Sequence, residues 1–270
     1  MMIKLKLTKV MASSLILASV FALNPIGASA EWKKDSKGWW YTEGDSWATG
    51  LREINGKQYY FDKTGYMVED KIVDNLYFDS NGARTEYICA DGFAVDKLTG
   101  TIIKFSRQDA RVRPGEPGIS VVIPREIGGV EIKGIGGKAF KICTNIKSIT
   151  IPDSVTNIED WTFSDCYKLE SITIPDSVTN IGEYAFVKCV NLKSITIPTS
   201  VTSIGDSAFR ECNKLTSITI PDSVTSIGDY AFSDCNNAIF YVGNEKTKQL
   251  ILNSNSKIDS NKIIIKSQII

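Results

Sequence analysis

Between Lys141 and Cys235, apolar residues return in the same order every 23 residues. Eleven of the 23 positions are identical in all four complete units of this stretch. A fixed period of this length is typical of a solenoid, in which each unit buries its apolar side chains by stacking on its neighbours. The complete units span residues 144–166, 167–189, 190–212 and 213–235.

Each unit predicts one short strand followed by a turn back. In the second unit, Leu169, Ile172 and Ile174 have the spacing L-x-x-I-x-I, which places Ile172 and Ile174 on the inner face of a strand. Pro175 ends this strand, because proline cannot donate to a strand ladder. The fold class is therefore mainly β, with short parallel strands in 23-residue coils.

The cysteines permit two interpretations. Five of them recur at the same position of each coil, so we expect a column of side chains that point the same way, about 4.8 Å apart. Such a ladder favours buried free thiols over bridges. A Cys89–Cys143 disulfide is the alternative, and a zinc site is not expected because the chain has no CxxC cluster. The column consists of Cys143, Cys166, Cys189, Cys212 and Cys235.

Outward positions on the strands predict a flat lattice of hydroxyl groups flanked by charged residues that differ between units. A surface without a pocket favours docking of an extended polymer or a protein over catalysis. The predicted partner-binding residues are Lys147, Glu170, Lys193, Ser171, Thr173, Ser194 and Thr196. On the far limb of the coils, Trp161, Tyr184 and Tyr230 either pack between neighbouring coils, the interpretation that we favour, or remain exposed as anchors.

The unit resembles the BspA-type leucine-rich repeat of bacterial surface proteins, whose pattern is roughly C-x-x-L-x-x-I-x-I-P-x-x-V-x-x-I-G-x-x-A-F. The resemblance covers residues 119–235 and implies a leucine-rich-repeat solenoid that serves as a binding surface. Residues 91–105 look like the N-terminal cap of that family, and the segment after Cys235 looks like its closing cap.

The segment 31–82 contains four of the five tryptophans, in short aromatic strands separated by Gly, Asn and Asp turns. This alternation predicts β-hairpins of about 20 residues each. The spacing resembles the choline-binding, or cell-wall-binding, repeat. In that family, aromatic residues of successive hairpins enclose the quaternary ammonium of choline on teichoic acid.

The resemblance implies one aromatic box at the junction of the first two hairpins, which would bind the quaternary ammonium by cation–π attraction. Its candidate residues are Trp32, Trp39, Trp40, Trp47, Tyr59 and Tyr60. A second box is not expected, because Leu51 and Gln58 stand where that family has aromatic residues. Glucan or peptidoglycan are alternative wall ligands, and the aromatic residues also suit the core of a small β-segment.

The first 30 residues have the features of a secretory signal. Lys4, Lys6 and Lys9 precede an apolar stretch over 10–23, and Ala28-Ser29-Ala30 follows as a cleavage site. The apolar stretch is too short to span a bilayer, so we expect secretion and no transmembrane segment after cleavage. The full chain has 31 basic and 31 acidic residues. Removal of the three lysines of the signal segment leaves a net charge of −3, which does not predict a nucleic-acid partner.

The chain contains no histidine, which excludes catalysis and metal binding that depend on imidazole. We expect neither an enzyme nor a cofactor, although a carboxylate pair remains chemically possible. The sequence predicts a secreted, wall-associated protein for recognition or adhesion. A carbohydrate-binding accessory protein and a fragment of a wall hydrolase are the alternatives. The predicted parts are a signal peptide (1–30), wall-binding-like repeats (31–85), a linker and N-terminal cap (86–118), the solenoid (119–235) and a C-terminal cap (236–270).

Overall fold

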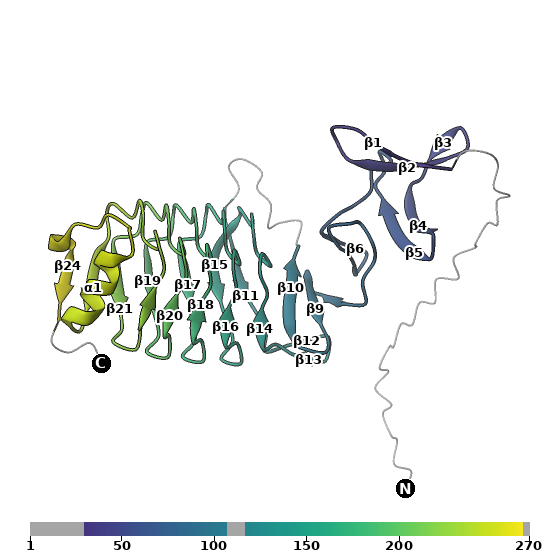
Figure 1. Cartoon of the computed structure of the whole chain (residues 1–270). Coiled ribbons are helices and arrows are strands. Elements are labelled where there is room, and N and C mark those ends of the chain that lie inside the picture. Colours follow the sequence, from purple (N-terminus) through teal and green to yellow (C-terminus); the bar gives the residue numbers. More distant parts are fainter. Residues whose placement is uncertain (1–29, 107–116, 267–270) are drawn as a thin grey trace, which may run out of the picture.

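The computed structural model describes residues 30–106 and 117–266, and Figure 1 shows their arrangement. A row of stacked coils carries the aromatic hairpins at one end and helix α1 at the other (Figure 1). The predicted signal peptide lies almost entirely outside the described residues. Within the two described stretches, no helix has both the length and the apolar character needed to cross a bilayer.

The aromatic segment consists of three antiparallel hairpins, as the sequence predicts. The first contains β1 (Trp32–Lys34), β2 (Trp39–Glu43) and β3 (Ser46–Trp47), the second β4 (Gly50–Ile54) and β5 (Lys57–Phe61), and the third β6 (Lys71–Val73) and β7 (Leu76–Phe78). Equivalent β-bridges join successive hairpins: Trp40 pairs with Tyr66, and Tyr59 pairs with Ala83. The hairpins therefore repeat one packing arrangement along the segment.

Three antiparallel strands cover the N-terminal end of the solenoid core. They are β8 (Ile88–Ala90), β9 (Phe93–Asp96) and β10 (Thr101–Phe105). Strand β10 also pairs in parallel with β14 (Gly134–Ile135), so the antiparallel cap continues directly into the first coil. Phe93 and Phe105 are buried; Phe105 stacks on Phe140 and Phe93 meets it edge to face, which closes this end of the core.

One side of the solenoid carries the predicted parallel strands. They are β11 (Ile119–Val122), β15 (Ile146–Thr150), β17 (Ser171–Thr173), β19 (Ser194–Thr196), β21 (Ser217–Ile220), β23 (Ile239–Val242) and β24 (Ile263–Ile265). Ser148 pairs with Ser171 and Ser194 pairs with Ser217, so the register advances by one full unit per coil. In β17 and β19 the central isoleucine is buried and its two neighbours face solvent, as the alternation predicts.

The structure also contains a second parallel ladder that the sequence did not predict. Each coil contributes two residues to it: β14, β16 (Asn157–Ile158), β18 (Asn180–Ile181), β20 (Ser203–Ile204) and β22 (Ser226–Ile227). The expectation of one strand per coil is therefore wrong. In the first coil, a small hairpin of β12 (Glu126–Ile127) and β13 (Val130–Glu131) accounts for the longer, glycine-containing turn.

The interior is a ladder of identical side chains. Phe163, Phe186 and Phe209 are fully buried, with ring centroids 5.3 and 5.1 Å apart. Beside them, the Sγ of Cys189 donates a hydrogen bond to the carbonyl oxygen of Phe163 at 3.2 Å, and the same contact recurs in the neighbouring coils. All six cysteines lie among the described residues and none forms a disulfide, which confirms the predicted thiol column and not the Cys89–Cys143 bridge.

The last coil is covered by a helix and one further strand. Helix α1 (Glu245–Asn253) begins at Asn244, whose side chain accepts a hydrogen bond from the backbone N–H of Thr247. Thr247 and Ile251 are its buried residues. A short 3₁₀ turn, Ser260–Lys262, then leads into β24, where Ile263 is buried against the core.

Candidate ligand-binding site

A cavity of about 370 Å³ opens at the junction of the first two aromatic hairpins. Its walls come from all three hairpins and the turns between them. The lining residues are Trp32, Trp39, Tyr59, Met67, Glu69, Ser80 and Asn81. Three of them, Trp32, Trp39 and Tyr59, belong to the box that the sequence predicts.

Strand alternation brings Trp32, Trp39 and Tyr41 to one side of the first hairpin. Trp39 and Tyr41 share one face of β2, and Trp32 lies opposite Tyr41 on β1, so all three rings project to the same side. The Trp32 centroid lies 6.4 Å from that of Trp39 and 5.0 Å from that of Tyr59, with interplanar angles of 89° and 72°. Nearly perpendicular rings form the adjoining walls of a box, which a flat stack of rings would not.

Trp32 also connects the cavity to the small core of this segment. Its ring contacts those of Tyr41 and Phe61 at centroid distances of 5.2 and 5.7 Å, and Phe61 is fully buried. The aromatic residues therefore serve both roles that the sequence left open, as a core beneath and as cavity walls above. A wall that is packed from behind is held in one orientation before any ligand arrives.

Met67 forms part of the wall because of the two hairpins that flank it. Its backbone N–H donates to the carbonyl oxygen of Trp39 at 2.7 Å, which holds the residue beside the first hairpin. Gly82 has φ +74°, and a Cβ there would lie 2.4 Å from the Met67 sulfur, so only glycine fits this turn. The Asp79 side chain accepts from the backbone N–H of Asn81 at 2.8 Å, which places Ser80 and Asn81 at the rim.

The other three predicted box residues lie away from the cavity. Trp40 is on the opposite side of β2 from Trp39, where the Lys33 ammonium lies 5.8 Å from its ring centroid. Tyr60 lies near Phe78 at a centroid distance of 6.0 Å. Trp47 is 54% exposed and packs against Gly65, where a Cβ would lie 2.2 Å from the indole.

The second hairpin junction has no comparable box. The strand register places Leu51 and Gln58 in the positions of Trp32 and Trp39, and Arg84 in the position of Met67. Arg84 Nη1 donates to Gln58 Oε1 at 2.5 Å, so the chain's own cation occupies the place of a cavity wall. Leu51 and Gln58 replace aromatic residues in the sequence, and the side chains at the second junction pack differently as a result.

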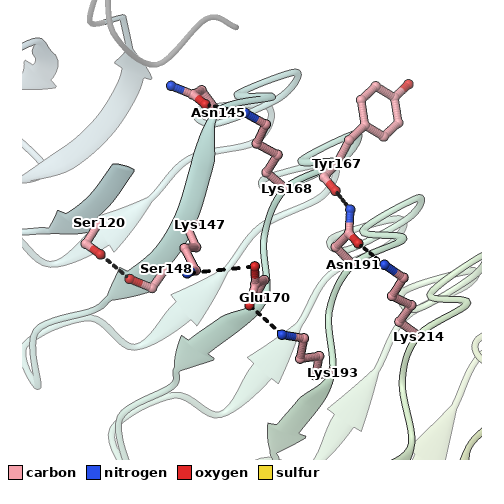
Figure 2. A network of polar contacts seen from close by, with 10 residues as sticks. All are labelled: Ser120, Asn145, Lys147, Ser148, Tyr167, Lys168, Glu170, Asn191, Lys193 and Lys214. Carbon is pink, nitrogen blue, oxygen red and sulfur yellow. Dashed lines mark hydrogen bonds and ion pairs between the residues drawn. The ribbon is translucent and has the colours of Figure 1, made fainter. Parts of the chain in front are cut away.

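The predicted partner-binding residues form one continuous stripe on the strand face of the solenoid. Figure 2 shows Glu170 between two lysines of the neighbouring coils, 4.0 Å from Lys147 and 2.6 Å from Lys193. The hydrogen bond from Lys193 is the main cause that lowers the pKa of Glu170 below its ordinary value. Ser171, Thr173, Ser194 and Thr196 are exposed beside this row.

A second row runs along the start of the strands, where asparagine and lysine alternate (Figure 2). Lys168 Nζ donates to Asn145 Oδ1 at 3.0 Å, and Lys214 Nζ donates to Asn191 Oδ1 at 2.7 Å. Asn191 also donates to the carbonyl oxygen of Tyr167 at 2.5 Å. These bonds link neighbouring coils and hold the ammonium groups of Lys168 and Lys214 on the same edge of the sheet.

On the far limb, Trp161 and Tyr184 pack between neighbouring coils as favoured, whereas the same expectation for Tyr230 is wrong. Trp161 and Tyr184 of adjacent coils stack with centroids 4.2 Å apart and an interplanar angle of 15°. The Lys141 ammonium lies 4.6 Å from the Trp161 centroid, on the same column. Ser207 in the next coil is buried, whereas Tyr230 is 49% exposed.

The candidate chemistry of both sites is binding. Within the described residues, no group of three or more Asp, Glu, Cys or His side chains is placed to hold a metal ion. The aromatic cavity offers ring faces, a thioether, one carboxylate and two small polar groups. The solenoid face offers hydroxyls and ion-paired side chains on a flat sheet.

Comparison with protein families assigns both repeat types. Residues 121–248 match the BspA type leucine rich repeat region in six copies, and residues 48–82 match the choline-binding repeat. Choline-binding repeats bind choline-containing cell-wall polymers. Members of both families are typically non-catalytic binding modules at the cell surface. No curated protein matches the chain.

Several solved structures are similar to parts of this chain. A leucine rich repeat protein of T. pallidum is 32% identical over 58% of this chain and 71% of its own, with a TM-score of 0.49. A leucine-rich repeat protein from Bacteroides ovatus is 32% identical over 64% of this chain and 40% of its own, with a TM-score of 0.46. The pneumococcal vaccine antigen PcpA is 24% identical over 67% of this chain and 47% of its own, with a TM-score of 0.50. The chain thus spans less than half of two of these proteins. With six such repeats, the chain belongs to the proteins with BspA-type leucine-rich repeats, and a choline-binding repeat precedes them.

Proposed function

We propose that this chain is a secreted, non-catalytic binding protein, held on the cell wall by its aromatic hairpins while the solenoid recognises a protein or a polysaccharide. The observation that carries the proposal is the cavity at the first hairpin junction, whose three aromatic walls are Trp32, Trp39 and Tyr59. In this proposal the attachment is non-covalent and acts through the cavity.

The cavity suits a quaternary ammonium group. Each aromatic face attracts a cation with about 0.5–2 kcal/mol, depending on how far the site excludes water. Trp32 and Tyr59 meet at 72°, so a compact cation in the corner that they form can contact more than one ring. Met67 adds a polarisable thioether that packs against methyl groups. Choline on teichoic acid is the wall component with this chemistry.

The strand face of the solenoid supports the recognition role. Lys147, Glu170 and Lys193 form a charged row with 2.6 and 4.0 Å ion pairs, and the adjacent serine and threonine hydroxyls are exposed. A flat surface of this composition is suited to hydrogen bonding along an extended partner. The residues of this row differ between coils, so they give an otherwise uniform lattice its specificity.

Sedimentation with isolated cell walls tests the attachment. Residues 31–270 should sediment with the walls, and free choline should release them. The Trp39→Ala variant should remain in the supernatant. A Lys147→Ala/Lys193→Ala variant, altered only on the solenoid face, serves as the matched control and should still sediment. Retention of Trp39→Ala on walls, or loss of the control, would show that attachment does not depend on the cavity.

A zymogram on purified walls tests the absence of catalysis. We expect no clearing, because binding repeats account for most of the described chain. Clearing at the position of the purified protein would favour the alternative of a wall hydrolase fragment. A heat-denatured sample on the same gel controls for co-purified hydrolases.

A further inference from the structure

The aromatic cavity contains one charged side chain. Of the seven residues that line it, six are aromatic, thioether, hydroxyl or amide side chains, and Glu69 is the carboxylate. Glu69 is exposed and forms no ion pair with any described residue. The neighbouring carboxylate, Asp70, is already engaged by the Tyr77 hydroxyl and by Lys104. A carboxylate on the cavity wall without a cationic partner is therefore open to a ligand.

We propose that Glu69 makes this site selective for a positively charged headgroup over a neutral group of the same shape. The inference rests on the proposed function of the cavity and adds the residue that sets its charge preference. Aromatic walls and Met67 contact a trimethylammonium and a tert-butyl group over similar areas, because the two groups have nearly the same size. Cation–π attraction to the rings already favours the ammonium, and the carboxylate adds to this preference because only the ammonium gains a Coulomb attraction to it.

A second charge lies beside one wall of the cavity. The Lys34 ammonium lies 5.0 Å from the centroid of Trp39, so a cationic ligand approaches a wall that already has a positive charge beside it. Like charges in this geometry repel. Glu69, on the segment that follows Met67, supplies the opposite charge at the cavity and offsets Lys34. The pair of charges thus leaves the site able to accept a cation.

The test compares choline with its neutral isostere 3,3-dimethylbutan-1-ol, on residues 31–270, by tryptophan fluorescence at low ionic strength. Glu69→Gln should weaken choline binding about two- to fivefold, the effect of one solvent-exposed ion pair. The affinity for the isostere should be unchanged. Glu69→Lys should weaken choline further, and 0.5 M salt should reduce these differences because exposed charges are screened.

Glu53→Gln is the matched control, because Glu53 is an exposed glutamate of the neighbouring strand β4 that does not line the cavity. It should bind both compounds as the unsubstituted protein does. Unchanged choline binding in Glu69→Gln, or an equal loss for choline and the isostere, would overturn the role of Glu69 while the cavity itself stands. A protein that binds neither compound would overturn the proposed function, and this inference with it.

Discussion

Arg84 donates a hydrogen bond to Gln58 across the second hairpin junction, with 2.5 Å between Nη1 and Oε1. In the repeat register Arg84 stands where the first junction has Met67, and Gln58 stands where it has Trp39. The same backbone packing thus forms an aromatic cavity at one junction and an internal polar contact at the next. The difference limits the number of ligand sites in the segment.

We therefore predict one choline site per chain in residues 31–270. Isothermal titration calorimetry should give a stoichiometry close to one, and Arg84→Ala should leave it unchanged, because Leu51 and Gln58 supply no aromatic wall. A stoichiometry of two in the unsubstituted protein would contradict the assignment of a single cavity.

The cysteine column should be chemically inert in the folded protein. Burial raises the pKa of Cys166, Cys189 and Cys212, and alkylation proceeds through the thiolate, so little reactive form exists at pH 8. Cys89 is half-buried, and its pKa is also raised by burial, so it should react slowly. Intact mass after iodoacetamide should show one modification in the folded state and six after denaturation. Rapid native modification of several thiols would mean that the column is not packed as described.

The phenylalanine ladder should contribute strongly to stability. Phe186 is fully buried between Phe163 and Phe209, so Phe186→Ala removes contacts in two directions and should lower the free energy of unfolding by about 3–5 kcal/mol. Urea denaturation measures this change. The exposed Thr196→Ala is the control and should change the same quantity by about 0.5 kcal/mol or less. Similar effects of the two substitutions would contradict the position of the ladder in the core.

Lys147 and Lys193 should determine the pKa of Glu170. Its folded-state pKa is lowered, so any stability from this carboxylate is present above its unfolded pKa and is lost as the pH falls through the folded value. Lys193→Ala removes the main hydrogen bond and should raise the pKa of Glu170 toward its ordinary value, as NMR titration of the side chain would show. Lys147→Ala should raise it less, because that pair is 4.0 Å apart against 2.6 Å. The reverse order would contradict the observed pairing.

The solenoid was largely predictable because its repeat fixes the geometry of every coil at once. The alternation around Ile172 gave the strand, and the period gave the thiol column, since equivalent residues of stacked coils must align. The second ladder was missed for a physical reason. Its strands are two residues long, such as Asn180–Ile181, and two residues are too few to show an alternation.

The binding site was predictable only in part. Trp39 and Trp40 are adjacent, as are Tyr59 and Tyr60, so a shift of one residue in strand register exchanges which ring faces the cavity. The pairing of β1 with β2 resolves this choice in the structure. Met67 and Glu69 follow the second hairpin and Asn81 follows the third, so these residues reach the cavity through packing between hairpins, which no local pattern indicates.

Substitution of two tryptophans, one in the cavity wall and one outside it, tests most directly whether choline binds in this cavity. Choline binding to residues 31–270 should be measured by calorimetry for Trp39→Ala, which removes a cavity wall, and for Trp47→Ala, which removes an exposed indole outside it. We predict a loss of about tenfold or more for Trp39→Ala and unchanged affinity for Trp47→Ala. Unchanged binding in Trp39→Ala together with a loss in Trp47→Ala would contradict the assignment of the ligand to this cavity.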